Sequence, residues 1–228
     1  MTVNGTVQKP VVFDFVVPYW QSTQNGIVNN NGNVVLKHAK IKNAGIGYYS
    51  YTTDNDDLQN CEIFNNYWGI VMHWTHSYGT EKAKIVNCNI HDNATWDNQG
   101  RGITLSNSSP QIYATTIRKN DYGLYCVANS NPYDTTDETY SYNIIDSNNV
   151  GILSYYSSPM LGYVDDDQGG ILISGGGNTV KNNSIFNVMA DTNCNVYVER
   201  NYWGTKDPAL FNIYSVSGSI VYTDYYHG

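Results

Sequence analysis

The chain has 228 residues, a formal net charge of −8, a pI of about 4.9 and only 14% charged residues. Its 12 basic residues are scattered, so it lacks the clustered Lys and Arg that bind a phosphate backbone, and we expect no nucleic-acid partner. It also lacks a run of 18 apolar residues, so we expect no membrane span.

Residues 1–24 precede the repeating part of the chain. Val11–Val17 is apolar but short, contains Asp14 and lacks a basic flank and a cleavage site, so we interpret it as a strand and not as a signal peptide. Residues 26–28 predict another strand, and Asn29–Gly32 predicts a turn. We therefore place a lead-in or cap at residues 1–24.

From residue 36 a motif of alternating apolar and polar residues recurs, which predicts a strand with one buried face. Its second apolar residue, here called the anchor, stands at Ile41, Ile63, Ile90, Ile117, Ile145 and Ile185. The anchors from Ile63 to Ile145 lie 27, 27 and 28 residues apart. A regular interval of this size indicates a repeat architecture.

A turn and a second strand follow most anchors. An asparagine stands three positions after the anchor at Asn66, Asn93, Asn120 and Asn148. We expect these side chains to tolerate turn geometry, to stack and to satisfy turn backbone. A glycine stands six positions after the anchor at Gly47, Gly69, Gly123 and Gly151, and Gly102 takes this role after an insertion around Trp96. The second strand is predicted to start directly after each glycine.

The four cysteines do not form a disulfide scaffold in a chain of this length, and no CxxC pair suggests zinc. Cys61 and Cys88 occupy the same phase of successive repeats, so we expect one above the other in the interior. Two buried thiols are the simpler interpretation, and a bridge between neighbouring coils is the alternative.

Two strands, a turn and a variable return loop make one coil, which cannot bury its apolar face alone. Stacked coils share an axial core and pair as parallel strands. Sustained 3.6-residue periodicity and strict six-residue periodicity are both absent, which excludes helical repeats and argues against the left-handed hexapeptide helix.

The repeating residues resemble those of a known family. The recurring Asn and Ile positions and the Gly-Ile pairs are similar to the right-handed parallel β-helix repeat of pectin-lyase-like and NosD-like bacterial proteins, and residues 199–208 resemble their closing motif. The resemblance implies an all-β, single-stranded right-handed parallel β-helix of roughly seven coils. We expect one domain, 1–228, with coils at 25–210 and capping strands at 211–228.

The resemblance also implies a ligand groove along the outside of one parallel sheet. The strand after each glycine is the best candidate, because the longest insertions flank it. Aromatic side chains suit sugar rings, and the candidates for substrate binding are Tyr49, Tyr51, Trp74, Tyr125 and Tyr155. The alternative is that these aromatic residues only pack and cover stacked strands.

His73 and Arg101 are the candidate catalytic residues, because a histidine or an arginine near a loop carboxylate could act on a glycan. His76 and His91 are predicted to lie on other parts of the coil. Asp134, Asp137 and Glu138 border the candidate groove, but no spacing identifies a catalytic pair. The motifs of polygalacturonase-like, pectate-lyase-like and epimerase families are missing, which weakens the enzyme hypothesis.

Two acidic loops, Asp165–Asp167 and Asp54–Asp57, could hold Ca²⁺ through carboxylate oxygens, although solvated turns are the simpler interpretation. No other cofactor is predicted. We expect a monomeric extracellular or cell-surface protein that binds, or cleaves as a lyase or hydrolase, a polysaccharide. The alternative is a non-catalytic structural or surface-display module of a larger bacterial protein.

Overall fold

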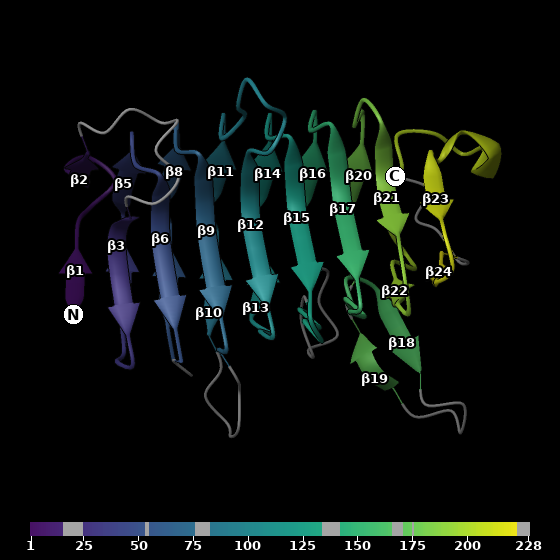
Figure 1. Ribbon diagram of the computed structural model, residues 1–228, viewed down its shortest axis with the longest axis horizontal. Helices are drawn as coiled ribbons and strands as arrows, with labels where there is room; N and C mark the ends of the chain where they lie inside the picture. Colours follow the sequence, from purple (N-terminus) through teal and green to yellow (C-terminus); the bar gives the residue numbers. More distant parts are fainter. Residues whose placement is uncertain are drawn as a thin grey trace.

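The computed structural model describes residues 1–15, 25–52, 55–75, 83–133, 142–165, 171–174 and 176–222. Almost all of its strands are parallel, and they form three long sheets that run side by side along the molecule (Figure 1). In the described residues the only helix is the 3-10 helix η1 (Pro208–Leu210). The predicted all-β parallel β-helix is therefore confirmed.

Each sheet takes one strand from each coil. The first sheet has the order β1 (Thr2–Asn4), β4 (Val35–Lys37), β7 (Asp57–Gln59), β10 (Lys84–Val86) and β13 (Gln111–Tyr113). The second has the order β2 (Val11–Asp14), β5 (Ala39–Lys42), β8 (Glu62–Phe64), β11 (Asn89–His91), β14 (Thr116–Arg118), β16 (Ile144–Asp146) and β20 (Thr179–Lys181). The third has the order β3 (Asn25–Asn30), β6 (Ile46–Tyr51), β9 (Trp68–His73), β12 (Arg101–Ser106), β15 (Tyr122–Val127), β17 (Val150–Tyr155), β21 (Phe186–Ala190) and β23 (Ile213–Ser215).

Smaller pairings complete the fold at the C-terminal end. β18 (Tyr163–Asp165) and β19 (Ile171–Ser174) form an antiparallel pair, and β22 (Asn195–Tyr197) pairs in parallel with β24 (Ser219–Val221). β23 and β24 come from the stretch that was predicted to cap the coils. At the other end, β1 and β2 come from the predicted lead-in, and they pair in register with β4 and β5.

Single residues in the left-handed backbone region turn the chain at the corners of each coil. Between the first and second sheets these residues are His38, Asn60, Asn87, Ala114 and Tyr142. Between the second and third sheets they are Asn43, Asn65, Asp92, Lys119, Ser147 and Asn182. After the third sheet they are Asn31, Thr52, Trp74, Asn107, Ala128 and Tyr156. Asparagine is frequent among them because it tolerates this conformation better than most residues.

The asparagine ladder lies directly after the second set of corners and connects successive coils. The Oδ1 atom of Asn120 accepts hydrogen bonds from the backbone N–H of Asn93 at 3.1 Å and from its Nδ2 at 3.0 Å. Asn120 Nδ2 in turn donates to Asn148 Oδ1 at 3.0 Å and to the Ile90 carbonyl at 3.3 Å. The predicted stack of structural asparagines is confirmed, and it continues through Asn183 to Asn187.

The anchors fill the axial core, where Ile41, Ile63 and Ile90 are fully buried. The prediction of one anchor, Ile185, was wrong. Ile185 is 53% exposed, and Val180, 1% exposed, pairs with Ile145 instead. Val180 follows Ile145 by 35 residues instead of 27 or 28, because the chain between β17 and β20 includes the additional strands β18 and β19.

Candidate functional site

The outward side of the third sheet, here called the aromatic face, carries the predicted glycan-binding residues. Three columns run across its strands, and their members pair in register from coil to coil. The first column contains Ile46, Trp68, Arg101, Tyr122 and Val150. The second contains Tyr49, Val71, Thr104, Tyr125 and Leu153, and the third contains Tyr51, His73, Ser106, Val127 and Tyr155. Alternate residues of the same strands, such as Ile103 and Leu105, belong to the interior core.

Rings of the third column contact one another along the sheet edge. Tyr51 and His73 stack with ring centroids 5.5 Å apart, and the Trp74 ring lies 5.7 Å from that of His73. Three coils beyond His73, Tyr155 and Tyr156 meet edge to face at 4.5 Å. Tyr51, Trp74 and Tyr155 are 40–46% exposed, so their rings are accessible to a ligand. These predicted binding residues therefore lie on one surface.

Arg101 lies in the middle of the aromatic face, between rings from the coils on both sides. Its Cζ atom is 4.7 Å from the Trp68 ring centroid and 4.0 Å from that of Tyr125, so both rings make cation–π contacts with the guanidinium. Burial lowers the pKa of Arg101, although an arginine stays charged. Among the described residues its Nε atom has no hydrogen-bond partner and no carboxylate forms a salt bridge with it.

The second column is largely covered. Its members Val71, Thr104 and Leu153 are only 5–9% exposed. They lie outside the interior core cluster, so the large side chains of the neighbouring columns cover them. Thr104 Oγ1 is buried and has no hydrogen-bond partner in the described part of the chain. Thr104 and Arg101 thus place two unsatisfied polar groups on one strand.

The candidate catalytic residues His73 and Arg101 are not brought together. His73 pairs with Ser106, which lies five residues beyond Arg101 on β12, or roughly 16 Å at about 3.3 Å per residue. Burial lowers the pKa of His73, which favours the neutral imidazole near neutral pH. His91 lies on β11 in the second sheet, between Glu62 and Asp92, as expected from its position in the coil.

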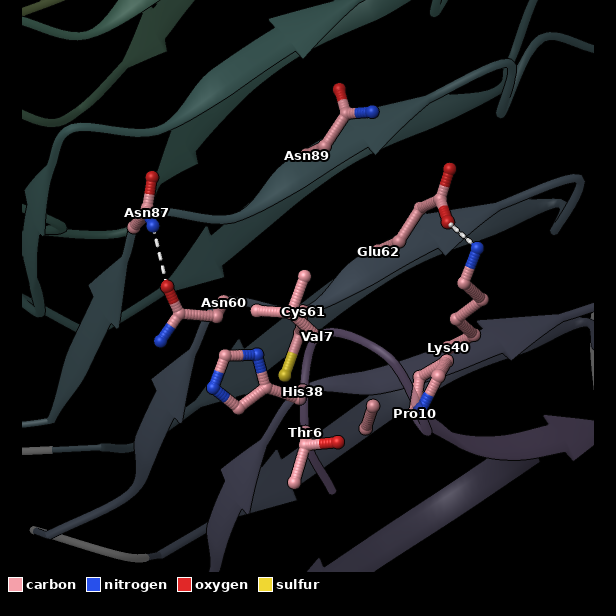
Figure 2. Close-up of a pocket in the computed structure, with 11 residues that line it drawn as sticks. Thr6, Val7, Pro10, His38, Lys40, Asn60, Cys61, Glu62, Asn87 and Asn89 are labelled. Atoms are coloured by element: carbon pink, nitrogen blue, oxygen red, sulfur yellow. Dashed lines mark hydrogen bonds and ion pairs between the residues drawn. The ribbon is translucent and has the colours of Figure 1, made fainter. Parts of the chain in front are cut away.

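The second sheet presents a different outer surface, and its described residues line two shallow pockets. One has a volume of about 350 Å³ and is lined by Asn89, Thr116, Arg118, Ile144 and Asp146. The other, of about 300 Å³, lies at the corner with the first sheet (Figure 2). Its lining includes His38, Lys40, Cys61, Glu62 and Asn89. Lys40 Nζ and Glu62 Oε2, both from this lining, form an ion pair of 2.7 Å.

The four cysteines are free and buried, which agrees with the simpler sequence interpretation. Cys61 and Cys88 lie one above the other, since the flanking residues Gln59 and Glu62 pair with Val86 and Asn89. The bridge that was considered as an alternative is not formed in this structure.

Comparisons with known proteins identify the family. A family model described as "Periplasmic copper-binding protein (NosD)" matches residues 9–220, nearly the whole chain. The chain belongs to the NosD family. A crystal structure of pectate lyase Pel9A is similar at 14% sequence identity with a TM-score of 0.44, and the match covers 99% of this chain and 64% of that one. Among curated proteins, none matches.

Some predicted features of this NosD-family chain fall outside the described residues. His76, Asp134, Asp137, Glu138, Asp166 and Asp167 belong to this group, and Asp165 is described only by its backbone at the end of β18. The calcium site at Asp165–Asp167 therefore stays a prediction. Within the other acidic loop, Asp56 is fully buried and accepts hydrogen bonds from Asn29, Ser50 and the Val34 N–H. It therefore has a structural role. No described helix has the length and apolarity of a membrane span.

Sequence reasoning missed the first column of the aromatic face. Trp68, Arg101 and Tyr122 each stand directly before a coil glycine, whereas the second strand was predicted to start after the glycine. The signal was present, because the residue before the glycine is large in successive repeats. Arg101 was identified as a candidate catalytic residue, but without its aromatic neighbours Trp68 and Tyr125.

Proposed function

We propose that this chain is an exported, periplasmic or extracellular β-helix protein that binds an acidic polysaccharide along its aromatic face. The observation that carries the proposal is Arg101, held between Trp68 and Tyr125 without a carboxylate partner in the described chain. The family description supports the location, since it names a periplasmic protein. The proposal concerns binding in the first place.

The chemistry of the aromatic face suits a sugar that carries a carboxylate. Exposed Tyr and Trp rings offer flat apolar surfaces for the C–H faces of sugar rings and hydroxyl or N–H groups for their edges. The planar guanidinium of Arg101 presents donors in a geometry that matches a carboxylate. In a chain with a net charge of −8, this isolated cation gives the surface a local preference for anions.

The corner after the third sheet provides a second argument for a binding role. In other coils this left-handed position holds residues such as Asn31 and Asn107, which adopt it at little cost. Trp74 and Tyr156 occupy the same position with φ of 57° and 48°, although bulky side chains disfavour it. Each extends the row of exposed rings next to His73 or Tyr155. Both corners therefore add an exposed aromatic ring to the aromatic face.

The family description also names copper. Copper sites use Cys, His and Met side chains that converge. Among the described residues no three His, Cys, Asp or Glu side chains gather closely enough to hold a metal ion. The described His, Cys, Asp and Glu side chains therefore do not fit a copper centre, and we propose no copper-dependent step.

Isothermal calorimetry with oligomers of a uronic acid and with matched neutral oligomers tests the proposal. We expect the wild type to bind the acidic oligomer more tightly, because only that ligand engages Arg101. Trp68→Ala and Tyr125→Ala should each weaken binding roughly tenfold, since each removes a stacking surface and one wall around Arg101. The control is Tyr142→Ala, which removes a 65% exposed ring outside the aromatic face.

Equal binding by Trp68→Ala, Tyr125→Ala and Tyr142→Ala would contradict the proposed site. No binding of any glycan by the wild type would favour the alternative of a structural or display module. Cleavage is measured on the same samples, through ultraviolet absorbance of an unsaturated uronate and through reducing-end release. A signal that is lost in His73→Ala or Arg101→Ala would add catalysis to binding.

A further inference from the structure

We propose that Cys61 and Cys88 form a redox-active dithiol, which a small disulfide compound entering the pocket in Figure 2 converts into a disulfide between neighbouring coils. The inference concerns the second sheet and its corner, and it does not depend on glycan binding. Three features of this corner carry it: the register of the two cysteines, their isolation from the other two thiols and the pocket that Cys61 lines.

The register places the two cysteines at a distance that a disulfide can span. Gln59 pairs with Val86 and Glu62 pairs with Asn89, so Cys61 lies opposite Cys88. The Asn89 N–H donates to the Cys61 carbonyl at 2.8 Å, which fixes this alignment at the cysteine itself. Neighbouring strands lie about 4.8 Å apart, and disulfides join Cα atoms about 4.4–6.8 Å apart. The two backbones therefore need little movement.

Cys61 and Cys88 lie next to each other in successive coils and form an isolated pair. Each thiol donates only to backbone carbonyls among the described residues: Cys61 to those of Leu36 and Gln59, and Cys88 to those of Leu58 and Val86. The neighbouring Cys88 side chain lowers the pKa of Cys61. Burial raises the pKa of Cys88. The same column continues with Ala39 on one side and Thr115 on the other, so no third thiol competes.

Only one of the two sulfurs belongs to a residue that lines the pocket. Cys61 is part of the lining of the 300 Å³ pocket, together with His38, Asn60 and Asn87, whereas Cys88 is not. Figure 2 shows Cys61 among the pocket-lining side chains. A lowered pKa together with access makes Cys61 the attacking thiol and leaves Cys88 to resolve the intermediate.

The reaction balances as a two-electron exchange. The Cys61 thiolate attacks one sulfur of the small disulfide, the reagent S–S bond breaks, and one thiol leaves with a proton. Cys88 then loses its proton and attacks the Cys61 sulfur, which displaces the second reagent thiol. The protein loses two hydrogen atoms, and the reagent gains them as two thiols.

The test is intact-mass and peptide-map spectrometry of the folded protein after incubation with hydroxyethyl disulfide. We expect the wild type to lose two of its four thiols and to yield a peptide linked through Cys61 and Cys88. The Cys88→Ser variant should instead accumulate a mixed disulfide between Cys61 and one thiol unit of the reagent. The Cys61→Ser variant should form neither product. Cys126 is an internal control, because it is fully buried and its strand partners Leu105 and Ser154 carry no thiol.

The wild-type peptide map keeps the test valid even if a variant fails to fold, and circular dichroism checks each variant. Closing a 27-residue interval should also raise the Tm of the oxidised protein above that of the reduced one. A folded wild type that keeps all four thiols would overturn the proposal. Oxidation of Cys126 or Cys194 as fast as the Cys61–Cys88 pair would overturn it as well.

Discussion

The outer faces of the second and third sheets differ sharply, although the same coils build both. On the second sheet, charged side chains pair with each other, as in Lys40–Glu62 and Lys42–Asp14. On the third sheet, aromatic rings dominate, and Arg101 contacts rings. Both sheets adjoin the same asparagine ladder and the same core. The interior and the corners therefore determine the fold, and the outward positions are free to carry different chemistry.

The largest expected effect comes from disrupting the asparagine ladder, which both sheets adjoin. Asn120→Ala removes the hydrogen bonds that join Asn120 to Asn93, Asn148 and the Ile90 carbonyl, and it leaves buried backbone groups without partners. We expect a loss of about 3 kcal/mol or more in the free energy of unfolding, measured by urea denaturation. Asn30→Ala, at an exposed position on β3, should change it by less than about 0.5 kcal/mol. Similar losses for both variants would show that the ladder does not hold the coils together.

The next change acts where the chain enters the third sheet. A Cβ atom at residue 102 would lie 2.7 Å from the Gly123 carbonyl oxygen and 2.9 Å from Asn120 Nδ2. Gly102→Ala should therefore cost about 1–3 kcal/mol of stability. Because Gly102 follows Arg101, this variant should also disturb the aromatic face, which acidic-oligomer binding detects. Gly32→Ala is the control, since the atom nearest to a Cβ at that position, Asn29 Oδ1, would lie 3.3 Å away.

Charge substitutions distinguish the two faces in binding. Arg101→Gln should remove most of the preference for acidic over neutral oligomers, a change of roughly tenfold or about 1.4 kcal/mol, because the cation of the aromatic face is lost. Lys40→Gln removes a cation from the second sheet and should leave that preference unchanged. The ratio of the two dissociation constants is the readout. An equal loss of preference in both variants would point to net charge and not to a site.

The smallest expected effect lies on the second sheet. The hydrogen bond and charge of Lys40 lower the pKa of Glu62 below its usual value of 4.5, so the pair contributes stability above that pH and loses it as pH falls through the lowered pKa. Glu62→Gln should cost about 0.5 kcal/mol at pH 7 and less at pH 3. Thermal unfolding at the two pH values measures the difference. A cost that persists at pH 3 would indicate lost packing instead of a lost ion pair.

The sequence allowed the repeating parts of the structure to be predicted. The intervals between Ile63, Ile90, Ile117 and Ile145 predicted stacked strands, because each coil must bury its own apolar positions above those of the previous one. The asparagine ladder followed from the same spacing. Ile185 was misplaced because spacing alone does not reveal the strands inserted between β17 and β20.

The candidate site could be predicted only in part. Tyr49, Tyr51 and Tyr125 were assigned to one outward face from alternation alone, and they lie on it. Trp68 and its contact with Arg101 were missed, because this contact depends on register between coils and on a strand that begins before the glycine. Thr104 is buried by side chains of the neighbouring columns, and the periodicity of its own strand does not predict which side chains stand there.

The most direct test of the account is a crystal structure of the protein with a bound oligomer of a uronic acid. We predict that the sugar rings lie along the third sheet, over the rings of Trp68 and Tyr125, with a carboxylate within hydrogen-bond distance of the Arg101 guanidinium. An oligomer bound in the pockets of the second sheet, with the aromatic face empty, would contradict the account.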